Sequence, residues 1–263
     1  MTLSTTTTTA TPKPARRAAP TAAVLRTEAR LFGRELGSLF WILLFPVALL
    51  CILGAVPSFR EPSADLGGLR VIDLYVPTMI VMSMIMAAIM SMPALIWAYR
   101  EAGVLRRLRT TPVRPPSLLG AQVLLHGAAV TASSVLVLLV GRLVFDVPLP
   151  QALAAYAGAY LLGLLAAFSL GAVATAVAPN ARAGTVLASI LFFGSMFTAG
   201  VWFPVEGMGG ALRTVVDLTP MGASVQAMTA ALVGDLPQLR DVLVVLVWTV
   251  LTGAVSVRTF RWE

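Results

Sequence analysis

The sequence predicts an all-α, polytopic integral membrane protein with six transmembrane helices. Hydrophobic residues make up 58% of the 263 residues, charged residues only 12%, and the mean hydropathy is +0.87. Soluble domains carry about a quarter charged residues, so this composition lies outside their range. Uncharged stretches long enough to cross a bilayer recur along the chain. They cover residues 36–59, 74–99, 115–141, 147–181, 183–205 and 242–257.

The first residues predict a tail and a helix on the membrane surface. Residues 1–24 are rich in Thr, Pro and Ala and lack the apolar core of a signal peptide, so we expect a disordered cytoplasmic tail before a six-helix transmembrane domain at 25–263. Apolar residues then fall on one helical face and arginines on the other, which is typical of an interfacial helix. The two sets are Leu25, Ala29, Phe32 and Leu36, and Arg26, Arg30 and Arg34. A basic start that merely orients the first span is the alternative, and both place this end in the cytoplasm.

Basic residues predict which loops face the cytoplasm, because cytoplasmic loops carry an excess of Lys and Arg. With both termini inside, 14 of the 19 basic residues are cytoplasmic and eight of the 12 acidic residues are outside. The 14 are Lys13, Arg16, Arg17, Arg26, Arg30, Arg34, Arg100, Arg106, Arg107, Arg109, Arg114, Arg182, Arg258 and Arg261. These arginines lie beside apolar runs, where anionic lipid headgroups are the expected counter-charge. The net charge of +7 therefore does not indicate binding of nucleic acid.

The link between the second and third spans predicts a docking site for a partner. It reads REAGVLRRLRTTPVRPP from Arg100 to Pro116 and holds five arginines. Val104, Leu105 and Leu108 share one helical face, and prolines end the helix. A short amphipathic helix of this kind suits a groove on a partner protein. The alternative is a basic loop that only orients the chain.

The stretch before the last span predicts an element that enters the membrane from outside and turns back. It reads FTAGVWFPVEGMGGALRTVVDLTPMGASVQAM at 197–228 and is broken by Pro204, by glycines and by Pro220. Its uncharged part at 218–234 is short for a seventh span, which would also place the C-terminus outside. Broken backbone at membrane depth is tolerated where protein or a wet cavity shields it, so an outer exit gate is one interpretation. An ordinary outer loop with an interfacial helix is the other.

Three features within the spans predict packing rather than chemistry. Small residues repeat every four positions in the fourth span and favour close helix contact inside the bundle, or at a subunit interface. They are Ala159, Gly163, Ala167 and Gly171. Six methionines between Met79 and Met92 suit core or lipid-facing packing, or else a surface for varied apolar ligands. The sole histidine, His126, is expected to be a hydrogen-bonded structural group rather than a proton relay.

The residue types present exclude several classes of function. The only lysine is Lys13, so the chain has no phosphate-binding GxxxxGK[ST] loop and any ATP must be hydrolysed by a partner. One His and one Cys give no base–nucleophile pair and no metal set, so we expect no enzyme and no bound cofactor. An ion-coupled secondary transporter is a weaker alternative, because no Asp or Glu lies at the centre of a span. A membrane anchor without transport activity is another.

The link and the outer element together carry a resemblance to a known family. The patterns RExGxLxRLRxTPxxP and GxWFP, the latter followed by LTP, are similar to those of the permease subunit of type-2 ABC exporters. That group includes daunorubicin-resistance-type drug exporters and polysaccharide exporters. On its coupling region fall Arg100, Glu101, Gly103, Leu105, Arg107, Leu108, Thr111 and Pro112, and on its outer re-entrant gate fall Gly200, Phe203, Pro204 and Pro220. Val104, Gly209 and Asp217 depart from the family's pattern.

The resemblance implies a separate ATPase subunit that binds ATP and Mg, a permease homodimer, and outward transport between the two permeases. ATP-driven closure of the ATPase pair would push the coupling helices and switch the bundles between inward-open and outward-open packings. Almost wholly apolar spans favour a hydrophobic or amphipathic cargo, such as a drug, an antibiotic or a lipid-like molecule, over a polysaccharide. Abundant Ala, Gly and Val with Arg in place of Lys is typical of a bacterial genome rich in G and C, which predicts a bacterial cell membrane.

Overall fold

Six long apolar helices form the body of the protein. The computed structural model describes residues 20–104, 107 and 115–259, and in that part of the chain six helices are long and apolar enough to cross a membrane. The predicted all-α, six-span fold is confirmed, and the chain is a multi-pass membrane protein. The six spans are Leu36–Gly54, Val71–Glu101, Ser117–Phe145, Leu153–Val177, Ala181–Thr198 and Leu239–Thr259.

The first two spans are each interrupted by a π turn. The first joins α2 (Leu36–Leu39), the π turn η1 (Phe40–Leu44) and α3 (Phe45–Gly54), and the second joins α4 (Val71–Ile85), the π turn η4 (Met86–Ser91) and α5 (Met92–Glu101). A proline follows directly in each case, Pro46 at the start of α3 and Pro93 at the start of α5. Proline has no N–H to donate to the preceding turn, so the helix widens there.

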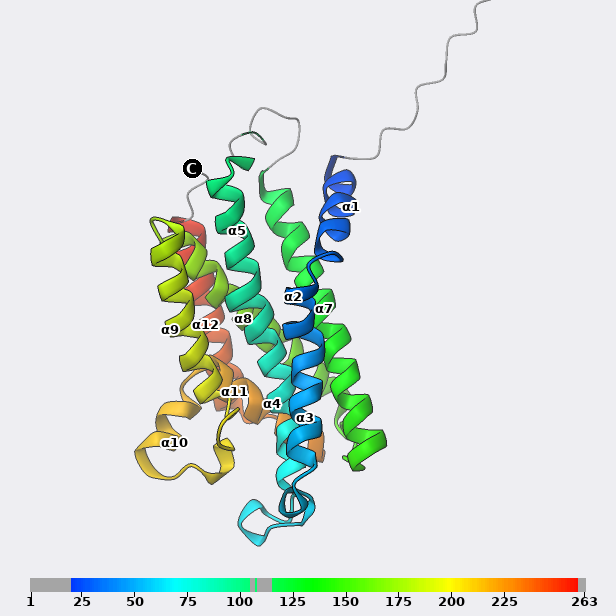
Figure 1. The fold of residues 1–263 in the computed structure, drawn as a ribbon. Helices are drawn as coiled ribbons and strands as arrows, with labels where there is room; N and C mark the ends of the chain where they lie inside the picture. The colour runs from blue at the N-terminus through cyan, green and yellow to red at the C-terminus, as the bar shows by residue number, and fades with distance from the viewer. Residues whose placement is uncertain (1–19, 105–106, 108–114, 260–263) are drawn as a thin grey trace, which may run out of the picture.

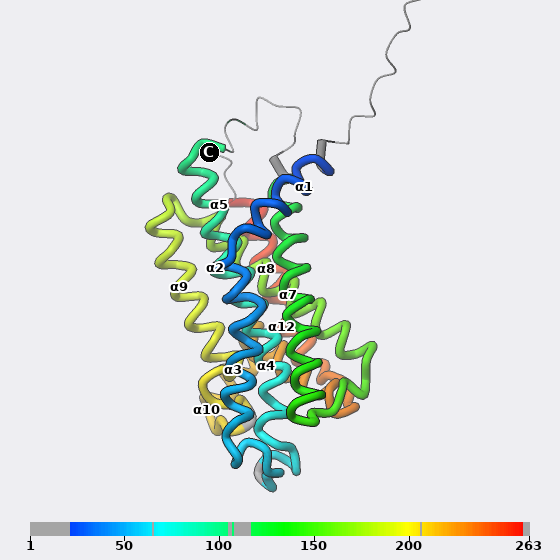
Figure 2. The backbone as a smooth tube through the Cα atoms, turned by 45° about the vertical axis from the view of Figure 1, so that its right-hand side comes forward, coloured from blue at the N-terminus to red at the C-terminus, as the bar shows by residue number. Residues whose placement is uncertain are grey.

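The remaining helices place the ends of the chain on one side. They are α1 (Pro20–Phe32), α7 (Pro115–Phe145), α8 (Leu153–Val177), α9 (Ala181–Thr198), α10 (Gly210–Asp217), α11 (Pro220–Val233) and α12 (Leu239–Thr259). Figure 1 shows α1, the end of α5, the start of α7 and the end of α12 at one end of the bundle, here called the α1 end. The loop at 55–70 and α10 lie at the opposite end, here called the α10 end, and the view in Figure 2 agrees.

The second span is the centre of the bundle. Within its most apolar window 72% of the residues are buried, compared with 17% in the first span and 22% in the fifth. Met79, Ile80, Met84 and Ile85 are fully buried there. The other helices therefore pack around α4 and η4, while the first and fifth spans keep large apolar surfaces for lipid or for another protein.

The N-terminal helix buries a face different from the predicted one. The helix begins at Pro20, inside the segment predicted to be a tail, because proline fits the first turn of a helix. Phe32 is buried as expected, but Ala29 is exposed and Glu28 is only 8% exposed. The face of α1 that packs on the bundle therefore includes the Glu28 carboxylate, which the hydropathy pattern did not single out.

Two spans do not coincide with their uncharged stretches, as expected from the lengths, because the sixth stretch is short for a span and the fourth is too long for one straight helix. The last span begins at Leu239 rather than at 242, because the Asp241 carboxylate is paired with the neighbouring arginine and can lie in the first turn. The fourth uncharged stretch opens with a non-helical segment at 146–152. The Gln151 and Ala152 amides there donate hydrogen bonds to carbonyls at the end of α11. These bonds satisfy backbone groups that have no partner within a helix.

Candidate functional site

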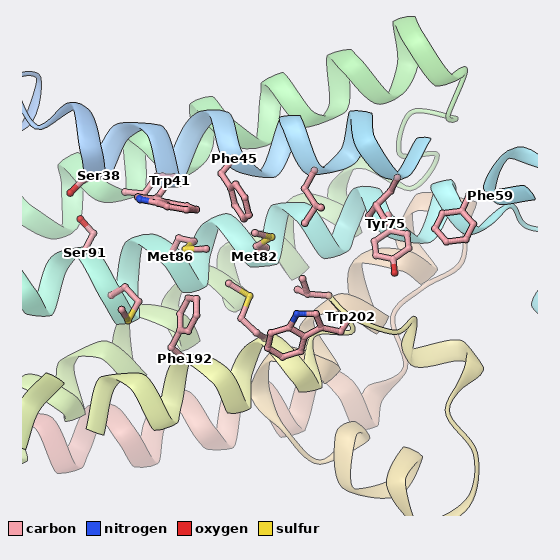
Figure 3. Close-up of a pocket in the computed structure, with 16 residues that line it drawn as sticks. Ser38, Trp41, Phe45, Phe59, Tyr75, Met82, Met86, Ser91, Phe192 and Trp202 are labelled. Atoms are coloured by element: carbon pink, nitrogen blue, oxygen red, sulfur yellow. The ribbon is translucent and has the colours of Figure 1, made fainter. Parts of the chain in front are cut away.

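A long apolar groove lies between the first, second and fifth spans. Its volume is about 850 Å³, and Figure 3 shows aromatic and methionine side chains pointing into it from three helices. The residues that line it are Ser38, Trp41, Ile42, Phe45, Leu49, Leu53, Phe59, Tyr75, Met82, Met86, Met90, Ser91, Phe192, Met196, Val201 and Trp202. No charged residue is among these described lining residues. The groove is therefore suited to an apolar or amphipathic guest.

The groove follows the membrane normal for much of the bilayer's thickness. Ser38 and Leu53 both line it, and fifteen helical residues of the first span separate them, a rise of about 22 Å. Ser38 and Ser91 mark its polar end toward α1, and Phe59, Tyr75 and Trp202 mark the other end in Figure 3. The hydrocarbon core of a bilayer is about 30 Å thick, so the groove reaches across most of it.

Methionines from the second span supply part of the groove surface. Met82, Met86 and Met90 line it, whereas Met79 and Met84 are buried in the core. One side of the span thus packs the core and another faces the groove, while the binding of apolar ligands stays a prediction. Flexible thioethers let that wall adjust to guests of different shape.

The outer element turns sharply at Gly200, one of the residues predicted to belong to the gate. Gly200 has φ +79°, and a Cβ placed on it would lie 2.8 Å from Cγ2 of Val205, so only glycine fits this turn comfortably. Phe203 is exposed and Pro204 half-buried in the same turn. Pro220 lies elsewhere, as the first residue of α11.

The helix α11 is a buried helix that is too short to cross the membrane. It has 14 residues, of which 11 are buried, and it packs against α8, α12 and α4. Thr219 caps its first turn by accepting a hydrogen bond from the Gly222 amide, and Pro220 occupies the position that needs no N–H. Pro220 therefore marks the predicted break in this stretch, because α10 ends at Asp217 and α11 starts at Pro220.

A buried polar cluster joins the outer element to the last span. The Asp217 carboxylate accepts hydrogen bonds from Arg213 Nε at 2.8 Å and Gln226 Nε2 at 2.6 Å, and pairs with Arg240 Nη1 at 3.1 Å. Its side chain is only 10% exposed. The cluster ties α10, α11 and α12 together. Sequence reasoning missed it, although Asp217 directly precedes the uncharged stretch at 218–234 and Arg240 follows shortly after its end.

The described part of the predicted coupling region lies at the α1 end. Arg100 Nη1 donates to the Thr175 carbonyl of α8 at 2.9 Å, and Glu101 is exposed. Gly103 has φ +68°, and its carbonyl accepts from the Arg107 amide at 3.1 Å, which starts a new turn. The remaining predicted coupling residues fall outside the described part of the chain, and they are Leu105, Leu108, Thr111 and Pro112.

A second hydrogen-bonded group at the α1 end joins three helices. Glu28 of α1 accepts from Tyr99 Oη at 2.7 Å and from Gln122 Nε2 at 2.6 Å. One turn along α7, His126 Nδ1 donates to the Gln122 carbonyl at 2.9 Å and Nε2 accepts from Ser91 Oγ at 3.0 Å. His126 is completely buried with both ring nitrogens bonded, as expected for a structural histidine.

The small residues of the fourth span allow neighbouring backbones to approach. A Cβ on Gly171 would overlap the Ala88 carbonyl of η4, and one on Gly163 would lie 3.1 Å from Ser224 Oγ of α11. Ala159 and Ala167 are buried on the same helix. The structure thus places this stripe inside the bundle, against the second span and α11.

Comparison with known proteins identifies the family. The chain matches the ABC-2 type transporter family over residues 21–233, from α1 to the end of α11. No curated protein matches it. The matched region contains the groove, the described part of the link and the outer element, and covers well over half of the sequence. The chain therefore belongs to the ABC-2 type transporter family, as a multi-pass permease domain that carries out transport and not catalysis.

Proposed function

We propose that this permease exports a hydrophobic or amphipathic molecule, such as a drug, an antibiotic or a lipid-like compound, from a bacterial cell. It does so with a separate ATPase subunit that binds ATP and Mg, and as a homodimer with both termini in the cytoplasm. The groove between the first, second and fifth spans is the observation that carries this proposal, because the cargo needs a path of matching polarity across the bilayer.

The lining of the groove favours this cargo over the alternatives. Its polar groups include the hydroxyls of Ser38, Tyr75 and Ser91, too few to replace the hydration shell of a polysaccharide. Ion-coupled carriers use ionisable residues near the membrane midplane, and no described residue of the groove is ionised at neutral pH. An amphipathic molecule that moves from lipid into this groove would lose little solvation free energy, because both surroundings are mostly apolar.

A second copy of the chain would complete the wall of the groove. The helices on its two edges expose large apolar side chains, which include Leu44 and Ile52 on the first span and Ile190 and Phe193 on α9. Most soluble and membrane homo-oligomers use two-fold symmetry, in which one surface pairs with its own copy. A two-fold pair across these edges would enclose a path that one copy leaves open on one side.

The link after α5 is where we place force transfer from the ATPase. Arg100 and Gly103 lie at the α1 end, and Arg100 is anchored to α8 through the Thr175 carbonyl. Movement of the link would therefore pass to both α5 and α8. In the sequence, Leu105 and Leu108 supply apolar contacts for a partner groove, which contribute more than exposed ion pairs at about 0.2–1 kcal/mol each.

Two reconstitutions test the ATPase partnership. In proteoliposomes that hold permease and ATPase together, we expect daunorubicin, a fluorescent amphipathic probe, to accumulate only with ATP and Mg. Movement of the probe by the permease alone on an ion gradient would contradict the proposal. Replacing Leu105 and Leu108 by Asp should release a co-expressed ATPase from membranes at unchanged permease level. The control Leu236→Asp, in the exposed segment before α12 at the α10 end, should retain it.

The groove itself is tested by narrowing it. Met90 lines the groove and is 37% exposed, so Met90→Trp fills space without opening the core. We expect slower transport of the probe while basal ATP hydrolysis continues. Leu161→Trp is the control, since Leu161 is 56% exposed and does not line the groove. Equal transport rates for the two variants would place the path elsewhere.

A further inference from the structure

Two pockets meet end to end at the α1 end, on a side of the bundle that the groove does not use. The first holds about 370 Å³ and is lined mostly by apolar residues of α5, α7, α8 and α12, with Thr175 and Ser256 as the polar ones. The second holds about 830 Å³ and is polar, with walls from α5, α8, α9 and α12. Three consecutive pairs pass from the first pocket to the second, namely Ile96 and Trp97, Thr175 and Ala176, and Val257 and Arg258. An apolar site therefore continues into a polar one.

The polar pocket carries features that attract an anion. Arg100 and Arg258 line it, and Glu101 is its one acidic residue among the described lining residues. The pocket also includes the start of α9, an 18-residue helix whose N-cap, Asn180, accepts from the Ala183 amide at 2.9 Å. The first amides of a helix point outward from its end and favour a negative group there.

A buried donor points to a missing acceptor at the same place. Trp97 lines the polar pocket, is only 4% exposed, and its Nε1 has no hydrogen-bond acceptor among the described residues. Its Cε2, the atom bonded to Nε1, packs against Gly184 in the first turns of α9, where a Cβ would overlap it. The free N–H therefore lies beside the helix start. Leaving a buried donor without an acceptor is unfavourable, and a bound acceptor would remove that penalty.

We propose that this composite site binds one anionic phospholipid from the leaflet at the α1 end. The phosphate lies in the polar pocket, between Arg258, Trp97 and the start of α9, and one acyl chain fills the apolar pocket. A lipid is the one occupant that presents a phosphate and a hydrocarbon chain joined at the depth where the two pockets join. The proposal rests on the spanning bundle alone and does not depend on the cargo or on ATP.

Native mass spectrometry of the purified protein tests the site. The protein is offered equal amounts of phosphatidylglycerol and phosphatidylcholine with identical chains, and the ratio of bound lipids is measured. We expect phosphatidylglycerol to be preferred, and Arg258→Gln to lower that preference about fivefold, since a basic residue near the surface contributes about 1 kcal/mol. Trp97→Phe keeps an aromatic ring at this position and removes the donor, so it should lower the total amount of bound lipid, because both headgroups carry a phosphate.

The matched control is Arg182→Gln, which removes the same charge from an exposed residue of α9 that does not line the pocket. Its lipid preference should equal that of the unaltered protein. An equal loss in Arg182→Gln would show general surface charge and overturn the site, as would an unchanged ratio in Arg258→Gln. Two further results would also overturn it: displacement of the lipid by inorganic phosphate with no lipid preference remaining, and release of a co-expressed ATPase by Arg258→Gln at unchanged lipid ratio.

Discussion

The Tyr99 hydroxyl donates to the Glu28 carboxylate at 2.7 Å, and this bond fastens α1 to the last turn of α5. Gln122 of α7 binds the same carboxylate oxygen at 2.6 Å. One buried acidic group thus holds the surface helix, the end of the central span and the start of the third span. While these hydrogen bonds persist, α1 must move together with the link that follows α5.

Glu28→Ala is predicted to loosen the α1 end. It leaves the Tyr99 hydroxyl and the Gln122 amide buried without their acceptor, at a cost of about 2–4 kcal/mol. Thermal unfolding in detergent, followed by circular dichroism, should show a clear drop in midpoint. Glu35→Ala is the control on the neighbouring turn, because Glu35 is exposed, and its midpoint should stay within about 1 °C of the parent.

Gly171→Ala is predicted to force the fourth span away from the second. The new methyl group would overlap the Ala88 carbonyl, and backbone cannot yield as a side chain can, so overpacking should cost about 1–3 kcal/mol. Gly158→Ala lies on the same helix with open space around it, and should leave stability unchanged or raise it by up to about 1 kcal/mol. Equal unfolding midpoints for the two variants would contradict the close approach of α8 and η4.

Asp217→Ala is predicted to detach the outer element. It removes the buried carboxylate that Arg213, Gln226 and Arg240 share. Breaking such a buried pair costs about 3 kcal/mol, or about 6–12 °C in unfolding midpoint. Hydrogen exchange should rise in α10 before it rises in α4. Asp235→Ala is the control, since Asp235 is exposed and does not belong to the cluster, and its midpoint should stay close to that of the parent.

Cysteine labelling is predicted to place the α1 end in the cytoplasm. Cys51 is the only cysteine, so Cys51→Ser gives a clean background. A membrane-impermeant maleimide should label Asp235→Cys on intact cells and Arg182→Cys only after permeabilisation, because both positions are exposed at opposite ends of the bundle. The reverse pattern would invert the proposed orientation.

Hydropathy was sufficient to predict the six spans, but it did not predict the hydrogen bonds and ion pairs that hold the helices together. Six apolar stretches of membrane length fix six helices almost alone, because lipid leaves the backbone no other choice. The burial of Glu28 depends on Tyr99 and Gln122, which lie more than 70 residues away in sequence. The burial of Asp217 likewise depends on Gln226 and Arg240, which lie on two other helices.

The groove was only partly foreseeable. The methionines of the second span suggested a surface for apolar ligands, yet which of them face the groove depends on where Trp41 and Phe192 lie on two other helices. Periodicity in one helix carries no information about its neighbours. The coupling residues Leu105 and Leu108 fall outside the described part of the chain, so their role stays a prediction from sequence.

The uneven burial of the spans has a mechanical consequence for the groove. Its central wall belongs to the most deeply packed span, with 72% of the window buried, and its two edges belong to spans with 17% and 22% buried. Displacing an edge helix gives up few contacts, whereas displacing the centre gives up many. The groove thus has one stiff side and two compliant sides, which is the condition for accepting guests of unequal width without unfolding the host.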